Sequence, residues 1–143
     1  MERFKMIASS YLIFIDHGKI LLSRRFHTGY EDGKYSLPAG HIKNGETLTQ
    51  GGAREVLEEI GVRLNPKDLR LVHVMHRKYM DIRMDFFFVA ESRDQPVNME
   101  PSKCDELKWV PLESLPENTI PYIRHAIECY QKKVMYSEYG WEI

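Results

Sequence analysis

Clusters of apolar residues divide the 143-residue chain into strands and two amphipathic helices. The first apolar run is followed by a turn at His17 and Gly18 and by a second strand that ends in two arginines. Two more strands lie next to each other in the middle of the chain, and apolar residues at helical spacing mark one segment before them and one after. The predicted strands are 6–15, 19–25, 69–79, 82–91 and 106–110, and the predicted helices are 47–60 and 122–134.

The segments between these elements are polar or rich in glycine, and they are expected to be loops. Loops are predicted over 25–35 and 92–105, and short extended pieces are predicted over 36–42. Because strands and helices do not alternate regularly, the pattern indicates an α+β architecture with a mixed β-sheet sandwiched between helices. No repeat or linker divides the sequence, so residues 1–143 are expected to form a single domain.

Composition and charge exclude several classes of function. Hydrophobic residues make up 43% of the chain and charged residues 29%, which is ordinary for a globular protein. A net charge of -1 gives no general attraction to a phosphate backbone, so polymeric nucleic acid is not an expected partner. The apolar run 6–15 is too short to span a membrane. Cys104 and Cys129 lack the spacing of a zinc site, and both are predicted to be reduced thiols in a cytoplasmic protein.

Three glutamates gather on one face of the first predicted helix, because side chains three and four positions apart meet on a helix. They are Glu55, Glu58 and Glu59. Crowding of like charges costs a few tenths of a kcal/mol per pair, which Arg54 can offset by pairing with Glu58. The face is either a solvated surface or a site for a hard cation, since Mg²⁺ prefers oxygen ligands. Helix geometry alone leaves both interpretations open.

A longer segment around these glutamates resembles the Nudix box at every specified position. Gly40 is followed after five residues by Glu46, and after seven more by the run Arg-Glu-Val-Leu-Glu-Glu-Ile-Gly-Val at 54–62. Similarity to Nudix proteins extends over most of the chain. The resemblance implies an α/β/α sandwich that hydrolyses a nucleoside diphosphate linked to another group, with a nucleotide as its small-molecule substrate.

The same resemblance implies a divalent metal cofactor, normally Mg²⁺, with Mn²⁺ as an alternative. Its ligands would be Glu55, Glu58, Glu59 and the carbonyl of Ala39. Metals neutralise the charge of a polyphosphate and lower the pKa of water, and a nearby carboxylate can then accept the remaining proton. The residues that would hold the loop–helix–loop in shape are Gly40, Glu46, Arg54 and Gly61.

Three residues outside the box are candidates by the same resemblance. The run from Pro96 to Lys103 is similar to a loop of Nudix enzymes that hydrolyse nucleoside triphosphates, and Glu100 in it would bind metal or act as the base. The choice of base stays open between Glu100 and the three helix glutamates. Arg25 would contact phosphate, because MutT-like enzymes have a similar pair of arginines whose second member does so. Only one of the neighbours Arg24 and Arg25 is expected to face a pocket from a strand, and the other interpretation of the pair is a polar rim.

Asn118 is expected either to contact the nucleotide base or to cap the last helix, because its amide can donate and accept. His73 and His76 are three residues apart on a strand, so they should point to opposite faces and share no metal. Phe86, Phe87 and Phe88 are expected in the buried centre of the sheet. The aromatic segment 136–143 is expected to pack either at a homodimer contact or over the pocket.

Three functions are consistent with these features. The leading hypothesis is a MutT-like enzyme that cleaves nucleoside triphosphates, including oxidised or non-standard ones, to monophosphate and pyrophosphate. The alternative is a Nudix hydrolase of dinucleoside polyphosphates or of another nucleoside diphosphate linked to a group X, and Tyr79 has the spacing typical of the dinucleoside polyphosphate class. A non-catalytic nucleotide-binding module is disfavoured, because such modules typically lose box glutamates and this chain retains all of them.

Overall fold

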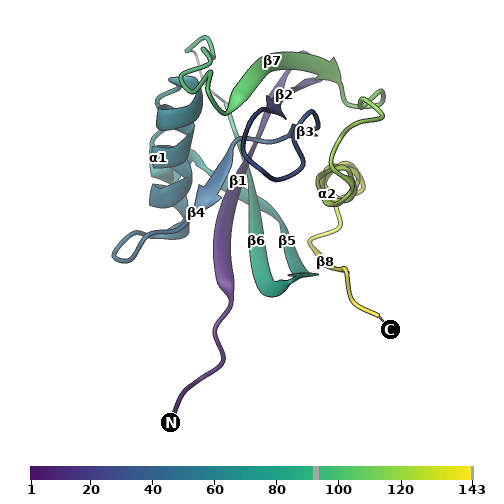
Figure 1. Ribbon diagram of the computed structural model, residues 1–143. Coiled ribbons are helices and arrows are strands. Elements are labelled where there is room, and N and C mark those ends of the chain that lie inside the picture. Colours follow the sequence, from purple (N-terminus) through teal and green to yellow (C-terminus); the bar gives the residue numbers. More distant parts are fainter. Residues whose placement is uncertain (92–93, 143) are drawn as a thin grey trace.

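The computed structural model describes residues 1–91 and 94–142. It shows a mixed sheet with helix α1 on one face and helix α2 on the other, which confirms the predicted α+β sandwich (Figure 1). The strands are β1 (Ile7–Asp16), β2 (Lys19–Arg25), β3 (Tyr35–Ser36), β4 (Ala39–His41), β5 (Arg70–Tyr79), β6 (Asp81–Ala90), β7 (Cys104–Pro111) and β8 (Tyr136–Tyr139). The helices are α1 (Leu48–Ile60), the short 3₁₀ helix η1 (Pro66–Asp68) and α2 (Pro121–Gln131).

Strand β1 lies in the middle of the sheet, whose main order is β3-β2-β1-β6-β5-β8. It runs parallel to β6 and antiparallel to β2 and β4. Strands β5 and β6 form the antiparallel pair expected from their adjacent sequences. Strand β7 pairs with β2, and its register shifts between Arg24 and Arg25, at the end of β2.

Alternating side chains fill a separate core layer on each face of the sheet. Tyr11 and Phe87 pack with Ile123 and other residues of α2 in one layer. Leu12, Phe88, Val56 and Ile60 belong to the other layer, beneath α1. Phe87 and Phe88 are 0% and 5% exposed, so the prediction that they lie in the buried centre of the sheet is confirmed, whereas Phe86 is only partly buried.

The first helix begins and ends where its sequence signals place it. Thr47 caps the N-terminus by accepting a hydrogen bond from the Gln50 N–H at 3.1 Å, and the Gln50 side chain accepts one from the Thr47 N–H. Gly61 closes the helix in the left-handed region, with φ of 68°, and its N–H donates to the carbonyl of Leu57. The glutamates of the last two turns are therefore held in a fixed register.

The C-terminal segment adds a strand that the sequence did not predict. Residues 136–139 form β8, which runs parallel to β5 at the edge of the sheet. Burial lowers the pKa of His73, so its ring stays neutral and can donate to the Val134 carbonyl at 2.7 Å and accept from Ser137 Oγ at 2.8 Å. Trp141 Nε1 donates to the carbonyl of His76. The segment thus packs along its own sheet and contributes no residue to the cavity described below.

Two further features concern membranes and thiols. Among the described residues, no helix is long and apolar enough to cross a membrane. Cys104 and Cys129 are both free thiols, and burial raises the pKa of each. Thiols of raised pKa are poor nucleophiles at neutral pH, so neither side chain is suited to covalent catalysis.

Substitution of Gly140 tests the contact between β8 and β5. Gly140 has φ of +85°, and a Cβ atom there would lie 2.3 Å from the carbonyl oxygen of Lys78. We expect Gly140→Ala to lower the free energy of unfolding by more than the roughly 1–2 kcal/mol of left-handed strain. Gly18→Ala is the control, since Gly18 has φ of +76° but nothing within 4 Å.

Urea unfolding followed by circular dichroism measures both variants, and amide hydrogen exchange of residues 136–139 shows whether β8 is released locally. Equal losses in the two variants would contradict the clash with Lys78.

Candidate functional site

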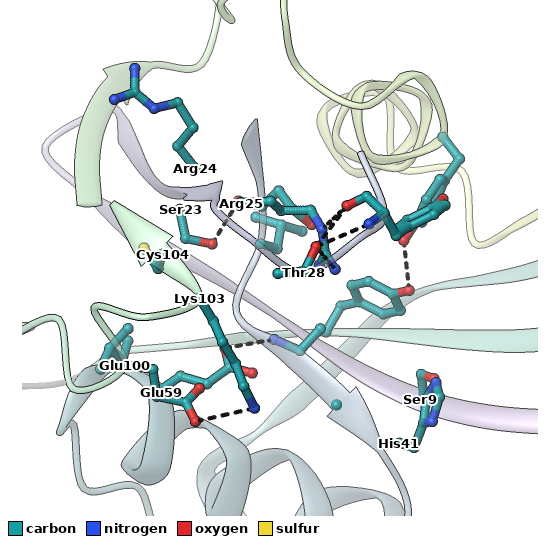
Figure 2. Close-up of a pocket in the computed structure, with 18 of the residues that line it drawn as sticks. Ser9, Ser23, Arg24, Arg25, Thr28, His41, Glu59, Glu100, Lys103 and Cys104 are labelled. Carbon is teal, nitrogen blue, oxygen red and sulfur yellow. Dashed lines mark hydrogen bonds and ion pairs between the residues drawn. The ribbon is translucent and has the colours of Figure 1, made fainter. Parts of the chain in front are cut away.

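A cavity of about 370 Å³ opens beside the end of α1, within the size range of small-molecule sites. Its walls include Arg25, Ala39, Gly40, Glu59 and Glu100, five residues singled out from the sequence (Figure 2). They come from β2, β4, α1 and the loop before β7. The fold therefore brings four separate segments of the chain to one cavity.

Carboxylates gather at the end of the cavity next to α1. Glu59 Oε2 accepts a hydrogen bond from the Ala39 N–H at 3.3 Å. Burial, the charge of Glu55 and, to a smaller extent, that of Glu100 raise the pKa of the Glu59 carboxyl to about 9. Figure 2 shows Glu59 and Glu100 on the same side of the cavity as Lys103, whose Nζ lies 4.0 Å from Glu100 Oε2. The crowding of carboxyl groups at this end thus disfavours a further negative charge, and the Glu59 carboxyl keeps its proton at neutral pH.

Arg54 connects the remaining acidic residues of the segment. Its Nη2 and Nε atoms donate to the two oxygens of Glu46 at 2.7 and 3.0 Å. Its Nη1 donates to Glu55 at 2.8 Å and to Glu58 at 3.3 Å, so the predicted pairing of Arg54 with Glu58 is confirmed. Hydrogen bonds from Arg54 and from the Lys43 N–H lower the pKa of Glu46 to about 2. Arg54 therefore ties the loop before α1 to the acidic face of the helix.

The lack of a side chain at Gly40 leaves room for the Glu55 carboxyl. A Cβ atom at Gly40 would lie only 2.1 Å from Glu55 Cδ, so any larger residue must displace that side chain. Gly40 also pairs with Ser10 across β4 and β1, which fixes the backbone at this point. The glycine at this position is thus explained by close packing against a glutamate.

We call this end of the cavity, with Glu59 and Glu100 and the neighbouring Glu55 and Glu58, the acidic end. It fits a divalent ion by its chemistry, because Mg²⁺ prefers carboxyl oxygens and a cation would favour the ionised form of Glu59. Across residues 1–91 and 94–142, however, no three acidic, His or Cys side chains are arranged to share one ion. Glu55 and Glu58 are instead in contact with Arg54, and the Glu58 side chain is 50% exposed. For these two glutamates to join Glu59 at one ion, their contacts with Arg54 would have to change.

Arg24 and Arg25 both border the cavity, but Figure 2 shows their side chains pointing in different directions, so the expectation that only one of them serves the site stays a prediction. The register shift between them interrupts the alternation of side chains at the end of β2. Arg24 Nε is neutralised by Asp105 at 2.7 Å. Arg25 donates to uncharged groups, the Tyr30 carbonyl at 2.7 Å and Thr28 Oγ1 at 3.0 Å. Of the two arginines, Arg25 is therefore the one whose positive charge is available to a phosphate group.

Buried charge and aromatic rings form a part of the wall that the sequence did not reveal. Arg77 Nε donates to Asp85 Oδ2 at 2.6 Å, and the Arg77 guanidinium carbon lies 3.7 Å from the centre of the Tyr122 ring. The Tyr11 and Tyr122 hydroxyls are 2.9 Å apart. One signal was present in the sequence, because Arg77 follows the inward-facing Met75 by two residues on the same strand.

Two further candidates differ in position. Tyr79 lines the cavity, and its ring lies 5.4 Å from that of Tyr30. The Asn118 side chain donates to the Gly33 carbonyl at 2.9 Å and is not among the cavity residues. The expected cap of the last helix is wrong, since Ile120 occupies that position and makes no side-chain cap. A contact between Asn118 and the base stays a prediction.

Comparison with known proteins gives both sequence relatives and structural neighbours. The family model described as NUDIX domain matches residues 5–129. Nudix hydrolase 6 of Arabidopsis thaliana is 33% identical over 85 residues, 57% of this chain and 29% of that protein. NAD-capped RNA hydrolase NudC of Escherichia coli (strain K12 / DH10B) is 34% identical over 97 residues, 68% of this chain and 36% of that protein. The chain thus spans about a third of the length of these relatives.

Solved structures share the fold at lower sequence identity. A MutT NUDIX hydrolase from Burkholderia pseudomallei superimposes with a TM-score of 0.79 at 24% identity, covering 87% of this chain and 98% of that one. The MutT protein from Methanosarcina mazei Go1 gives 0.78 at 24% identity, with 90% and 94% covered. Since the family model covers most of the chain and the fold agrees, the chain belongs to the NUDIX domain family, in which its matched relatives are hydrolases.

Proposed function

We propose that this protein is a Mg²⁺-dependent hydrolase that cleaves nucleoside triphosphates to monophosphate and pyrophosphate. One observation carries the proposal: the carboxylates of Glu59 and Glu100 share a cavity with the unneutralised guanidinium of Arg25. A polyphosphate needs cations on several sides, and Arg25 and an ion at the acidic end would supply them. Membership of the NUDIX family supports hydrolysis as the reaction.

Each part of the wall has a task in this reaction. Mg²⁺ at the acidic end, held by Glu59 with Glu55, Glu58, Glu100 and the Ala39 carbonyl, would supply neutralisation of phosphate charge and polarisation of water. Arg25 would hold a phosphate group in line with the attacking water, which is a matter of positioning. The four carboxylates of this end are the candidates to accept the proton of that water.

Hydrolysis of dinucleoside polyphosphates is the second candidate, and the placement of Tyr79 favours it. The Tyr79 ring is 44% exposed and meets Tyr30 at the cavity wall. Exposed aromatic rings can stack on a second heterocycle. The matched NudC relatives carry the name of NAD-capped RNA hydrolases, and that substrate also joins two nucleosides through a pyrophosphate. Both reactions would use the carboxyl groups of the acidic end. They differ in the group that the substrate carries on the far side of the phosphoanhydride bond that is cleaved.

A substrate panel separates the two candidates. With Mg²⁺ and ¹⁸O-labelled water, nucleoside triphosphates should give monophosphate and pyrophosphate, with the label in pyrophosphate if water attacks the β-phosphorus. Label in the monophosphate would place the attack at the α-phosphorus. Release of orthophosphate alone, or strong preference for a dinucleoside polyphosphate over every triphosphate, would refute the leading proposal and favour the second candidate.

Glutamine substitutions test the metal site. We expect Glu59→Gln and Glu58→Gln each to lower kcat on the order of 100-fold or more, because a charged ligand is lost where transition-state charge is stabilised. The folded state should be as stable as before or more stable, since like-charge crowding is relieved. The exposed Glu113→Gln is the matched control. Near-normal turnover in saturating Mg²⁺, with thermal unfolding unchanged, would remove that residue from the metal site.

Substitution of the paired arginines tests phosphate binding. Arg25→Ala should raise KM by on the order of ten-fold through loss of a charged hydrogen bond. Arg24→Ala should change KM by less than roughly three-fold, because Asp105 already neutralises that side chain at a partly exposed site. Arg25→Lys keeps the charge but loses the two-pronged donor geometry of the guanidinium, so its KM should lie between those of the wild-type protein and Arg25→Ala. Steady-state kinetics on the best triphosphate measures all three variants, and equal small effects at both positions would contradict the assignment.

A further inference from the structure

Three side chains of the cavity wall and an aspartate in contact with one of them form a connected cluster, and we call them the floor group. They are Tyr11, Arg77, Asp85 and Tyr122. Arg77 is 4% exposed and Asp85 is fully buried, so this ion pair is removed from solvent. Tyr11, Arg77 and Tyr122 line the cavity, whereas Asp85 lies behind Arg77.

Stability does not account for this pair. Two buried charges are costly to remove from water, and apolar residues of the same volume are commonly as stabilising or more so. The Oδ1 atom of Asp85 also accepts no hydrogen bond within the described part of the chain, which adds to the cost. A costly charged pair at the wall of a ligand-sized cavity is instead typical of a binding site.

Charge divides the cavity into two regions. Carboxyl groups gather at the acidic end, and the Arg25 guanidinium donates to uncharged groups. In the floor group, Asp85 cancels the charge of Arg77, and burial raises the pKa of Asp85 while the hydrogen bond from Arg77 opposes that rise. Arg83, which also lines the cavity, is likewise paired with Asp81 at 2.7 Å. This region therefore offers directed hydrogen-bond donors and flat rings without net charge.

The donors of the floor group are fixed in direction. Asp85 takes the Nε edge of Arg77, and the Tyr122 ring covers one face of the guanidinium. Arg77 Nη2 lies 3.5 Å from the Tyr11 hydroxyl, a long contact that a better acceptor can replace. Tyr11 is itself held by stacking on Phe87 at 4.6 Å between ring centres. The Nη donors are thus the part of Arg77 left for a ligand.

We propose that Arg77 is a specificity-determining residue that donates to an exocyclic carbonyl oxygen of the substrate's nucleobase, with Asp85 as the positioning residue that orients it. The inference rests on the proposed nucleotide hydrolase function and adds the class of base. A neutral planar ring suits the uncharged floor, and an arginine donor favours a base with a keto oxygen over adenine, which has none.

Binding of nucleoside monophosphates tests this without any turnover, so a failure of the proposed hydrolysis would not affect the result. The probes are inosine monophosphate and adenosine monophosphate, which differ at the 6-oxygen, and ribose 5-phosphate, which has no base. NMR titration of the protein in Mg²⁺ measures the three dissociation constants. We expect the inosine nucleotide to bind about ten-fold or more tightly than the adenosine nucleotide.

Substitutions in the floor group test whether its residues cause the preference for the inosine nucleotide over the adenosine nucleotide. Arg77→Lys and the double variant Arg77→Met with Asp85→Leu should weaken the inosine nucleotide about ten-fold and change ribose 5-phosphate less than two-fold. The double variant removes both charges together, which keeps a packed floor if the single change does not fold. Asp85→Asn keeps Arg77 but not its orientation, and should lower the ratio of inosine to adenosine affinity. Arg70→Lys, exposed on the same strand, is the control.

Each result decides the proposal. Selective loss of the inosine nucleotide in all three floor variants supports it. Equal losses for ribose 5-phosphate would mean that Arg77 binds phosphate, and equal affinities of the wild-type protein for the two nucleotides would mean that no keto oxygen is recognised. Either outcome would overturn the proposal.

Discussion

The alternation of side chains along β1 is the constraint on which the rest of the structure depends. Tyr11 and Ile13 enter the layer under α2, while Leu12 and Phe14 enter the layer under α1. The same strand anchors α1, because Ser10 Oγ donates to the Leu48 carbonyl at 2.8 Å. A shift of one residue would exchange the two layers and move the acidic end of α1 away from the cavity.

Most helices and strands could be predicted from the sequence because they carry strong local signals. The helix at 48–60 has a capping box at one end and a left-handed glycine at the other, and the strands at 70–79 and 81–90 are long, with apolar residues recurring along each. Strand β8 was not legible, since four residues with two tyrosines do not show alternation. Its position depends on His73 and β5, which are distant in the chain. The start of β7 at Cys104 was likewise set by pairing with β2.

The candidate site was predictable to the extent that its residues belong to a local motif. Glu59, Ala39 and Gly40 share one cavity as the spacing of the Nudix box implied, and Glu100 joins them from a loop. The floor around Arg77 was hidden because a charged residue in a strand looks like an exposed one until its partner is known. Asp85 lies eight positions away and across a strand pair. Pairings of this kind are tertiary, and a single sequence does not encode them in any spacing.

The family match and the sheet end at different residues, because strand β8 follows the matched segment. The family model ends at residue 129, whereas the sheet continues to Tyr139 and the chain then contacts β5 through Trp141. A protein cut at the end of the family match would leave the outer edge of β5 unpaired, and exposed strand edges invite pairing with other chains. Strand β5 carries Arg77 and Tyr79 of the cavity wall. The sheet therefore extends beyond the C-terminal end of the family match, and the residues after that end protect the edge of a strand that lines the cavity.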